Sequence, residues 1–304
     1  MATGQPTWAQ PQPQPADQQH GYQQTAGYQQ APGYQQAPAA PPRLPNRGSA
    51  VALRLVGVVV VLGLVALGAA STVVEFFRQE AVETLPLSAG VSRVVVGTDT
   101  GDIRVRAVVG AEAPRLTSTL HWSFDRPTVQ RNVSNDTEQL DARCPRHWVA
   151  SDCSVDLDLV LPAGTTLKID SDTGDVRING IAADLEATTA TGDVQLSAVS
   201  GANVTARTNT GDITVLATAQ GGMVQADTDT GDVRITLTAA PRSVHAKAST
   251  GDVTITVPPG DAYAVSASTD VGERTVSIAT DPASDRRISA VTSVGDIRLL
   301  AAGQ

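Results

Sequence analysis

Residues 228–235, "TDTGDVRI", contain a Gly-Asp corner that the chain uses eight times. Close copies are "TDTGDIRV" at 98, "SDTGDVRI" at 171, "TATGDVQL" at 189, "TNTGDITV" at 208, "ASTGDVTI" at 248 and "TSVGDIRL" at 292, and a diverged copy, "TDVGERTV", begins at 269. From the second copy onward the motif glycines lie 18 to 23 residues apart, so one structural unit of about 20 residues is reused. The eight corner glycines are Gly101, Gly174, Gly192, Gly211, Gly231, Gly251, Gly272 and Gly295.

Apolar side chains alternate on both sides of each corner, but the alternation shifts by one at the corner. Around Gly211, Val204 and Ala206 have even numbers, whereas Ile213 and Val215 have odd numbers. A straight strand would place Val204 and Ile213 on opposite faces. Both can face one core only if the chain bends between them. Glycine supplies the backbone freedom for this bend, and aspartate can hydrogen-bond the backbone of its own turn.

Stacking of these units predicts an all-β fold, with a β-solenoid of about 20-residue rungs over residues 163–304 and rungs about 4.8 Å apart. An antiparallel sandwich is the alternative. The solenoid explains why Ala, Thr, Gly, Asp and Val recur at matched positions, and why aromatic residues make up only 3% of the chain. Residues 75–162 are predicted to form an irregular, strand-rich start of the same domain, with the first rung at Gly101. Glu273 and Arg274, which replace Asp and Val or Ile, predict a distorted rung near the C-terminus.

The two segments before the repeats differ from them in composition. Residues 1–48 are rich in Gln, Pro, Gly and Tyr, and they lack the apolar surface that would offset the entropy of ordering, so we expect a disordered tail. Residues 55–74 are twenty positions without a charge, a length that crosses a hydrocarbon layer of ~30 Å. We therefore expect a transmembrane helix within residues 49–74, with a cleaved signal peptide as the alternative. Arginines before this segment and glutamates after it predict a cytoplasmic N-terminal tail and an extracellular C-terminal domain.

Charge and cysteine content limit the partners and the compartment. The formal net charge is −9, which disfavours nucleic acid as a partner because its phosphates attract basic surfaces. Cys144 and Cys153 are the only cysteines, and we expect neighbouring thiols outside the cytoplasm to oxidise. A disulfide across this short loop would stabilise the fold by roughly 2–3 kcal/mol. A redox or metal pair is the alternative, but only His147 lies nearby, and a structural zinc site needs four ligands.

Stacked corners would bring their aspartates into one column. Carboxylates one rung apart repel by about 1 kcal/mol in water, and one hydrogen bond from a turn N–H offsets this by roughly 1.5–3 kcal/mol. The column is therefore predicted to be structural, without metal or other cofactor. Calcium bridging adjacent rungs is the alternative, and its ligands would be Asp175, Asp193, Asp212, Asp232 and Asp252.

Threonine pairs precede three of the corners. They are Thr189 and Thr191, Thr208 and Thr210, and Thr228 and Thr230. Because they share numbering parity with the inward Val and Ala positions, we expect them to be buried near the corner. An outward-facing hydroxyl array, which could bind ice or polysaccharide, is the alternative.

The run "LVLPAGTTLKIDSDTGDVRING" at 159–180, followed by further TGDV units, resembles the DUF4097 family of β-strand repeat proteins, which also carries an adhesin label. The resemblance covers roughly residues 90–304 and is strongest over 155–256. It implies a β-helical fold and a surface location, and it brings no catalytic residues. A Gln/Pro/Tyr-rich tail, one membrane span and such an ectodomain together are similar to the layout of actinobacterial single-pass membrane proteins.

No nucleophile elbow, P-loop or zinc motif occurs in the sequence, and the four histidines are scattered. The sequence therefore predicts a non-catalytic, adhesin-like binding or scaffold module at the cell envelope. Its expected partners are membrane lipid, through the one helix, and an envelope glycan or protein ligand. One alternative is an enzyme acting on cell-wall polysaccharide, which would need paired carboxylates. Another is an envelope sensor whose tail recruits cytosolic partners.

Overall fold

The structure is a computed structural model that describes residues 57–61 and 78–303, except residues 89, 109–110, 146–151 and 220. Contacts divide the chain into Met1–Val59 and Val60–Gln304, and every strand belongs to the second unit. Residues 57–61 are helical, and none of the helical structure described here has the length and apolarity of a membrane span. The predicted tail, residues 1–48, and most of the predicted transmembrane segment, residues 49–74, lie outside the described residues.

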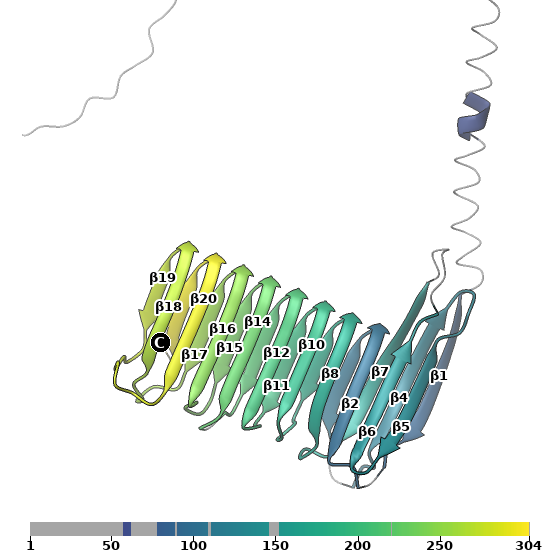
Figure 1. The fold of residues 1–304 in the computed structure, drawn as a ribbon, viewed down its shortest axis with the longest axis horizontal. Helices are drawn as coiled ribbons and strands as arrows, with labels where there is room; N and C mark the ends of the chain where they lie inside the picture. Colours follow the sequence, from purple (N-terminus) through teal and green to yellow (C-terminus); the bar gives the residue numbers. More distant parts are fainter. Residues whose placement is uncertain are drawn as a thin grey trace, which may run out of the picture. The chain divides into compact units, whose positions relative to one another are not determined.

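The repeat region forms two long sheets whose strands are stacked side by side (Figure 1), which confirms the predicted all-β class. Sheet A has eleven strands, in the spatial order β1 (Gln79–Pro86), β4 (Arg115–Trp122), β7 (Cys153–Leu161), β3 (Ile103–Ala107), β9 (Val176–Asn179), β11 (Val194–Val199), β13 (Ile213–Ala217), β15 (Val233–Leu237), β17 (Val253–Val257), β21 (Ile297–Ala301) and β19 (Arg274–Ser277). Sheet B has ten strands, in the order β18 (Ala264–Val271), β20 (Arg287–Val294), β16 (Ser243–Thr250), β14 (Met223–Thr230), β12 (Asn203–Thr210), β10 (Leu185–Thr191), β8 (Thr166–Thr173), β2 (Arg93–Thr100), β6 (Thr137–Arg143) and β5 (Thr128–Ser134).

Each repeat contributes one strand to each sheet. Around Gly211, β12 lies in sheet B and β13 in sheet A, and the Gly-Asp corner joins them. Neighbouring repeats pair in parallel with matched residues, so that Val204 lies beside Val224 and Ile213 beside Val233. Among the described strands, antiparallel pairing is confined to β1 with β4, β4 with β7, and β5 with β6. Equivalent residues of adjacent repeats therefore form columns that run across the sheets.

The corner changes the parity of the buried side chains. Val204, Ala206 and Thr208 are buried on β12, whereas Ile213 and Val215 are buried on β13. These side chains belong to one apolar core that runs through the stack. A single rung cannot cover its own apolar face, so each rung depends on its neighbours for stability.

The spatial order departs from the sequence order at the C-terminal end. Strands β20 and β21 pair with β16 and β17 on one side and with β18 and β19 on the other. The diverged copy around Gly272 is therefore the last rung of the stack, although it is not the last in sequence. Arg274 stands in the inward column beside Ile297, and its Nη1 donates a hydrogen bond to the carbonyl of Ala267 at 3.0 Å. This arginine spans the open end of the core.

The N-terminal part of the domain is more regular than its sequence indicated. The first rung, β2 and β3, packs directly beside β8 and β9, even though 73 residues separate Gly101 from Gly174. Strands β6 and β7 then add a further rung, because both pair in parallel with the first. Glu138 points inward on β6 and is fully buried. It pairs with Arg131 of β5 and accepts a hydrogen bond from the Ser88 amide at 3.1 Å.

Candidate functional site

The corner aspartates form a ladder of hydrogen bonds along one edge of the stack. The backbone amide of each corner residue donates to the Oδ1 of the aspartate in the neighbouring rung, at 2.8–3.1 Å. A charge-assisted bond of this kind stabilises by roughly 1.5–3 kcal/mol, more than the repulsion between neighbouring carboxylates. In spatial order the donor–acceptor pairs are Asp102–Asp156, Asp175–Asp102, Asp193–Asp175, Asp212–Asp193, Asp232–Asp212, Asp252–Asp232, Asp296–Asp252 and Glu273–Asp296.

Two details of this ladder differ from the sequence interpretation. Each aspartate bonds the corner of the next rung, because stacking brings that amide within reach of the carboxylate. The ladder also includes Asp156 on β7, where Val155 stands in place of the glycine. Only the register of β7 against β3, with Leu157 beside Ile103, identifies this position.

Glycine is required at the corners for two separate reasons. The φ angles of the eight corner glycines lie between +131° and +148°, a region that other residues rarely adopt. A Cβ atom on Gly211 would also lie 2.1 Å from the carbonyl oxygen of Gly192 in the preceding rung. The same approach, at 2.0–2.1 Å, recurs at all eight. These eight corners thus stack too closely for a side chain, whereas Val155 is tolerated because no parallel rung lies on its other side.

The threonine pairs divide their roles. Thr189, Thr208 and Thr228 are buried, and each Oγ1 donates to the glycine carbonyl of the neighbouring corner, at 3.2, 3.0 and 3.1 Å. The second members are exposed, because the chain turns outward before it reaches the glycine. The expectation that both members are buried is therefore wrong for Thr191, Thr210 and Thr230.

Arginines two residues after the corner contact the outer oxygens of the ladder. Arg177 Nη2 lies 2.7 Å from Asp175 Oδ2, and Arg298 Nη1 lies 3.1 Å from Asp252 Oδ2. The Asp296 amide holds the pKa of the Asp252 carboxyl below its usual value, and Arg298 adds to this effect. Within the described part of the chain, no group of three His, Cys, Asp or Glu side chains is arranged to hold a metal ion. The aspartates named above as calcium ligands each use Oδ1 for an amide of the ladder.

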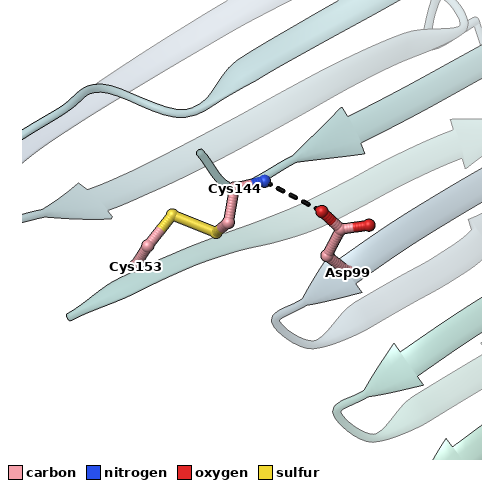
Figure 2. The surroundings of a disulfide bond; sticks show 3 residues. All are labelled: Asp99, Cys144 and Cys153. Carbon is pink, nitrogen blue, oxygen red and sulfur yellow. Dashed lines mark hydrogen bonds between the residues drawn. A yellow bond between two sulfur atoms is a disulfide. The ribbon is translucent and has the colours of Figure 1, made fainter. Parts of the chain in front are cut away.

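A disulfide closes the loop that joins β6 to β7, just before the corner positions held by Val155 and Asp156. Cys144 and Cys153 are bonded at 2.04 Å, and the Cys144 amide donates to Asp99 Oδ2 at 3.1 Å (Figure 2). Asp99 belongs to the first TGD copy. The disulfide therefore links β6 to β7 within one rung, and the hydrogen bond to Asp99 connects this rung to the neighbouring rung of β2 and β3.

The outer face of sheet A carries a hollow of about 580 Å³ close to the N-terminal end of the stack. Ten outward side chains from β4, β7, β3, β9 and β11 line it in two rows, which we call the arginine platform. One row, in spatial order, is Thr117, Asp158, Arg104, Arg177 and Gln195. The other row is Arg115, Val160, Arg106, Asn179 and Ser197.

Carboxylates at the margin fix the platform arginines in place. Arg106 Nη1 lies 2.6 Å from Glu112 Oε2, and Arg115 Nη1 lies 2.5 Å from Glu112 Oε1. These two hydrogen bonds lower the pKa of Glu112 to about 2, and the bond to Glu112 raises the pKa of Arg106. In the other row, Arg104 contacts Asp102 at 2.8 Å. The sequence interpretation missed this platform because its residues come from segments far apart in the chain.

A larger hollow, about 810 Å³, lies beside the terminal rung. Tyr263, Val265, Arg274 and Val276 are part of its lining. Val265 and Val276 point toward the core of the stack but have no further rung to cover them. The lining also includes outward residues of sheet B, among them His245 and Arg287, so this hollow covers both the open end of the core and the adjoining outer face.

Two parallel-stacked sheets joined by Gly-Asp corners define a repeat-built, all-β class of protein. Residues 73–300 match the family model described as Toastrack DUF4097, and the chain therefore belongs to this family. The resemblance seen in the sequence is thus confirmed. No curated protein matches the chain.

Solved structures with similarity to this chain come from several bacteria. A "putative adhesin" from Bacteroides fragilis is 15% identical, with 73% of this chain and 97% of that chain covered and a TM-score of 0.45. A "putative cell adhesion protein" from Clostridium sporogenes is 10% identical, with 73% and 100% covered and a TM-score of 0.34. A "Putative lipid binding protein" from Parabacteroides distasonis is 12% identical, with 74% and 97% covered and a TM-score of 0.33. At such low similarity, none of these names is transferred to this chain.

Proposed function

We propose that the protein is a non-catalytic binding or scaffold module, anchored in the membrane and displayed at the cell envelope on a β-solenoid. The observation that carries this proposal is the use of the repeated motif. Its glycines, its aspartates and the buried threonines all serve contacts between rungs. The residues that recur from repeat to repeat therefore have a structural role. The outward side chains between the corners are the ones available to bind a ligand.

The anchoring part of the proposal rests on the sequence. Residues 55–74 carry no charge, arginines precede them and glutamates follow. This pattern supports a cytoplasmic N-terminal tail and an external position for residues 75–304. The Cys144–Cys153 disulfide supports an oxidising compartment for the folded domain.

Protease accessibility in intact cells tests the topology. Cells would express the full chain with one epitope tag at each end. We expect external protease to remove the C-terminal tag and to leave the N-terminal tag intact until the membrane is permeabilised. The opposite pattern, or protection of both tags, would contradict the proposed orientation.

Co-sedimentation tests the binding role. The full chain, reconstituted in nanodiscs of phosphatidylcholine, would be mixed with isolated envelope fractions and centrifuged. We expect it to sediment with the wall fraction, whereas empty nanodiscs stay in the supernatant. Equal recovery of both in the supernatant would contradict a binding module.

A further inference from the structure

We propose that the arginine platform binds an anionic glycan, through carboxylate, phosphate or sulfate groups carried on the sugar chain. This inference rests on the proposed envelope-binding function, and it specifies the site and the chemical class of its ligand. The TGD motif alone does not identify this site. Arg104 and Arg177 follow corner aspartates by two residues, but Arg106 and Arg115 lie outside the motif copies and join them only through strand pairing.

The arginines of the platform are matched by an equal number of carboxylates, within a domain that is otherwise strongly acidic. The net charge is −9 for the whole chain and +2 for residues 1–74, so residues 75–304 carry −11. The ten platform positions hold four arginines and one aspartate, Asp158, which gives +3. The balancing carboxylates of Asp102, Asp175 and Glu112 contact the arginines from outside the two rows. With these three carboxylates included, the platform is neutral. A domain of net charge −11 therefore presents, at this one hollow, four guanidinium groups without a local excess of negative charge.

The arginines retain donors for a ligand. A guanidinium has five N–H groups, and the contacts with carboxylates engage at most two terminal nitrogens of any one platform arginine. The four side chains are between 38% and 46% exposed. Since the guanidinium fork matches carboxylate, phosphate and sulfate oxygens, the remaining N–H groups fit anionic substituents.

The spacing of the platform fits a polymer better than a single small anion. Arg104 and Arg177 sit on adjacent strands, about 4.8 Å apart. Arg106 follows two residues along β3, about 7 Å away, and Arg115 lies on β4, two strands from β3. Between and beside these cations lie hydroxyl and amide side chains, which hydrogen-bond sugar hydroxyls: Thr117, Asn179, Gln195 and Ser197.

A glycan fits this surface better than a nucleic acid does. Single-stranded nucleic acids are held largely by bases stacked on aromatic side chains, and the ten platform residues include no aromatic side chain. The −11 charge of the surrounding domain also opposes a long chain of closely spaced phosphates. Sparser charges separated by hydroxyl groups match the alternation of arginines with Thr, Asn, Gln and Ser.

Binding of defined polymers to the full chain in phosphatidylcholine nanodiscs tests the ligand class. The probes are hyaluronate, polygalacturonate, uncharged dextran and a single-stranded DNA oligonucleotide, each followed by biolayer interferometry. We expect at least one anionic glycan to bind, uncharged dextran not to bind, and affinity to fall as salt is raised, because exposed charges are screened. Tighter binding of DNA than of either anionic glycan would overturn the proposed class.

Paired substitutions test the site. The variant Arg104→Gln/Arg177→Gln is expected to weaken glycan binding by about tenfold or more, because two charge-assisted contacts are lost. Arg234→Gln is the matched control, since Arg234 is outward on β15 of the same sheet but outside the platform. It is expected to change affinity less than about twofold. Arg104→Lys/Arg177→Lys keeps the charge without the fork, and it should fall between wild type and the glutamine variant.

The outcomes separate this inference from the proposed function. If the wild type binds an anionic glycan and the glutamine variant binds it equally well, the platform is the wrong site, while the binding function stands. If the wild type sediments with envelope fractions but binds neither anionic glycan, the ligand class is wrong. If it binds neither envelope nor glycan, both proposals fail. Circular dichroism melts of every variant show whether a lost affinity reflects lost folding.

Discussion

A middle rung and the terminal rung of this stack carry the same motif in different surroundings. Around Gly211, Ile213 is buried between rungs on both sides, and Asp212 accepts an amide from the next corner. In the terminal rung, Arg274 holds the position that corresponds to Ile213, and it is exposed. The amide of Glu273 still donates to the ladder, but its carboxylate has no further corner to bond.

The comparison shows what constrains each position of the motif. Groups that face the preceding rung are retained at the end of the stack: Gly272 keeps its positive φ, and Thr269 Oγ1 donates to the Gly295 carbonyl at 2.9 Å. Two of the groups that would face a further rung have changed, at Glu273 and Arg274, whereas Val265 and Val276 keep the apolar type. The number of neighbouring rungs, rather than membership of the motif, therefore determines which substitutions each position tolerates.

The largest expected effect comes from exchanging the inward residues of the two rungs. Ile213→Arg buries a charge without a partner, and it should destabilise the domain by about 4 kcal/mol or more. Arg274→Ile loses only the hydrogen bond to Ala267, so its cost should stay below about 1 kcal/mol. Urea unfolding of the full chain in detergent micelles, followed by circular dichroism, measures both. Equal losses would contradict the dependence on neighbours.

Arg274→Ile should also change association. An inward charge at the end of a sheet opposes pairing with further strands, so its removal leaves an apolar, unpaired end. We expect a higher mass in concentrated samples by light scattering, and no such change for Arg287→Ile on the outer face of β20.

The corner glycines give the next effect. Gly211→Ala forces a Cβ against the Gly192 carbonyl in the middle of the stack, and we expect a loss of about 3 kcal/mol. Gly272→Ala meets a similar clash with Gly295, but the terminal rung can detach locally, so its loss should be smaller. Gly164→Ala is the control, since no atom lies within 4 Å of the added Cβ. Thermal melts rank the three variants by melting temperature. An equal drop in melting temperature for Gly211→Ala and Gly272→Ala would mean that the terminal rung is as constrained as a middle rung.

Acid should weaken both the ladder and the Glu112 contacts of the platform, with a smaller effect on stability than the substitutions above. The pKa of Asp252 is lowered from 3.8 in the folded protein, and that of Glu112 from 4.5 to about 2. A lowered pKa stabilises the fold above the ordinary value, and this contribution is lost as pH falls through the folded value. The melting temperature should therefore drop between pH 4.5 and pH 2. Asp252→Asn should flatten this dependence more than Glu273→Gln does, and identical profiles would contradict the role of the ladder amide.

The smallest effect separates the two members of a threonine pair. Thr208→Val removes the hydroxyl that donates to the Gly192 carbonyl, and it should cost about 1 kcal/mol. Thr210→Val changes an exposed side chain and should stay within about 0.5 kcal/mol. Denaturant midpoints of the two variants measure the difference, and a larger loss at Thr210 would contradict the assignment.

The sequence was sufficient to predict the repeat and the change of parity, because both depend on local spacing. Residue-number parity alone predicts which side chains of β12 and β13 are buried. The repeat also predicts that equivalent residues of stacked rungs lie beside each other. Asp156 could not be predicted, since it follows no glycine and joins the ladder only through the register of β7 with β3.

Long-range pairing explains the other differences. The platform depends on the pairing of Arg104 with Arg177 across 73 residues, and on the antiparallel placement of Arg115 beside Val160. The exposure of Thr210 depends on where the chain leaves the sheet before the corner. A repeat spacing of about 20 residues predicts neither which strands pair nor the residue at which the chain leaves the sheet.

The insertion of β20 and β21 ahead of the diverged rung makes the packing of that rung depend on a segment that is synthesised after it. Domains form from their N-terminal side as the ribosome delivers the chain, yet the rung that closes this stack is made before the rung on which it rests. A nascent chain ending at residue 286 would contain β18 and β19 but would lack β20 and β21, the strands with which they pair. Residues 287–301 must emerge from the ribosome before the rung that carries Arg274 can pack, so a product that stops before residue 287 would leave the end of the core uncovered.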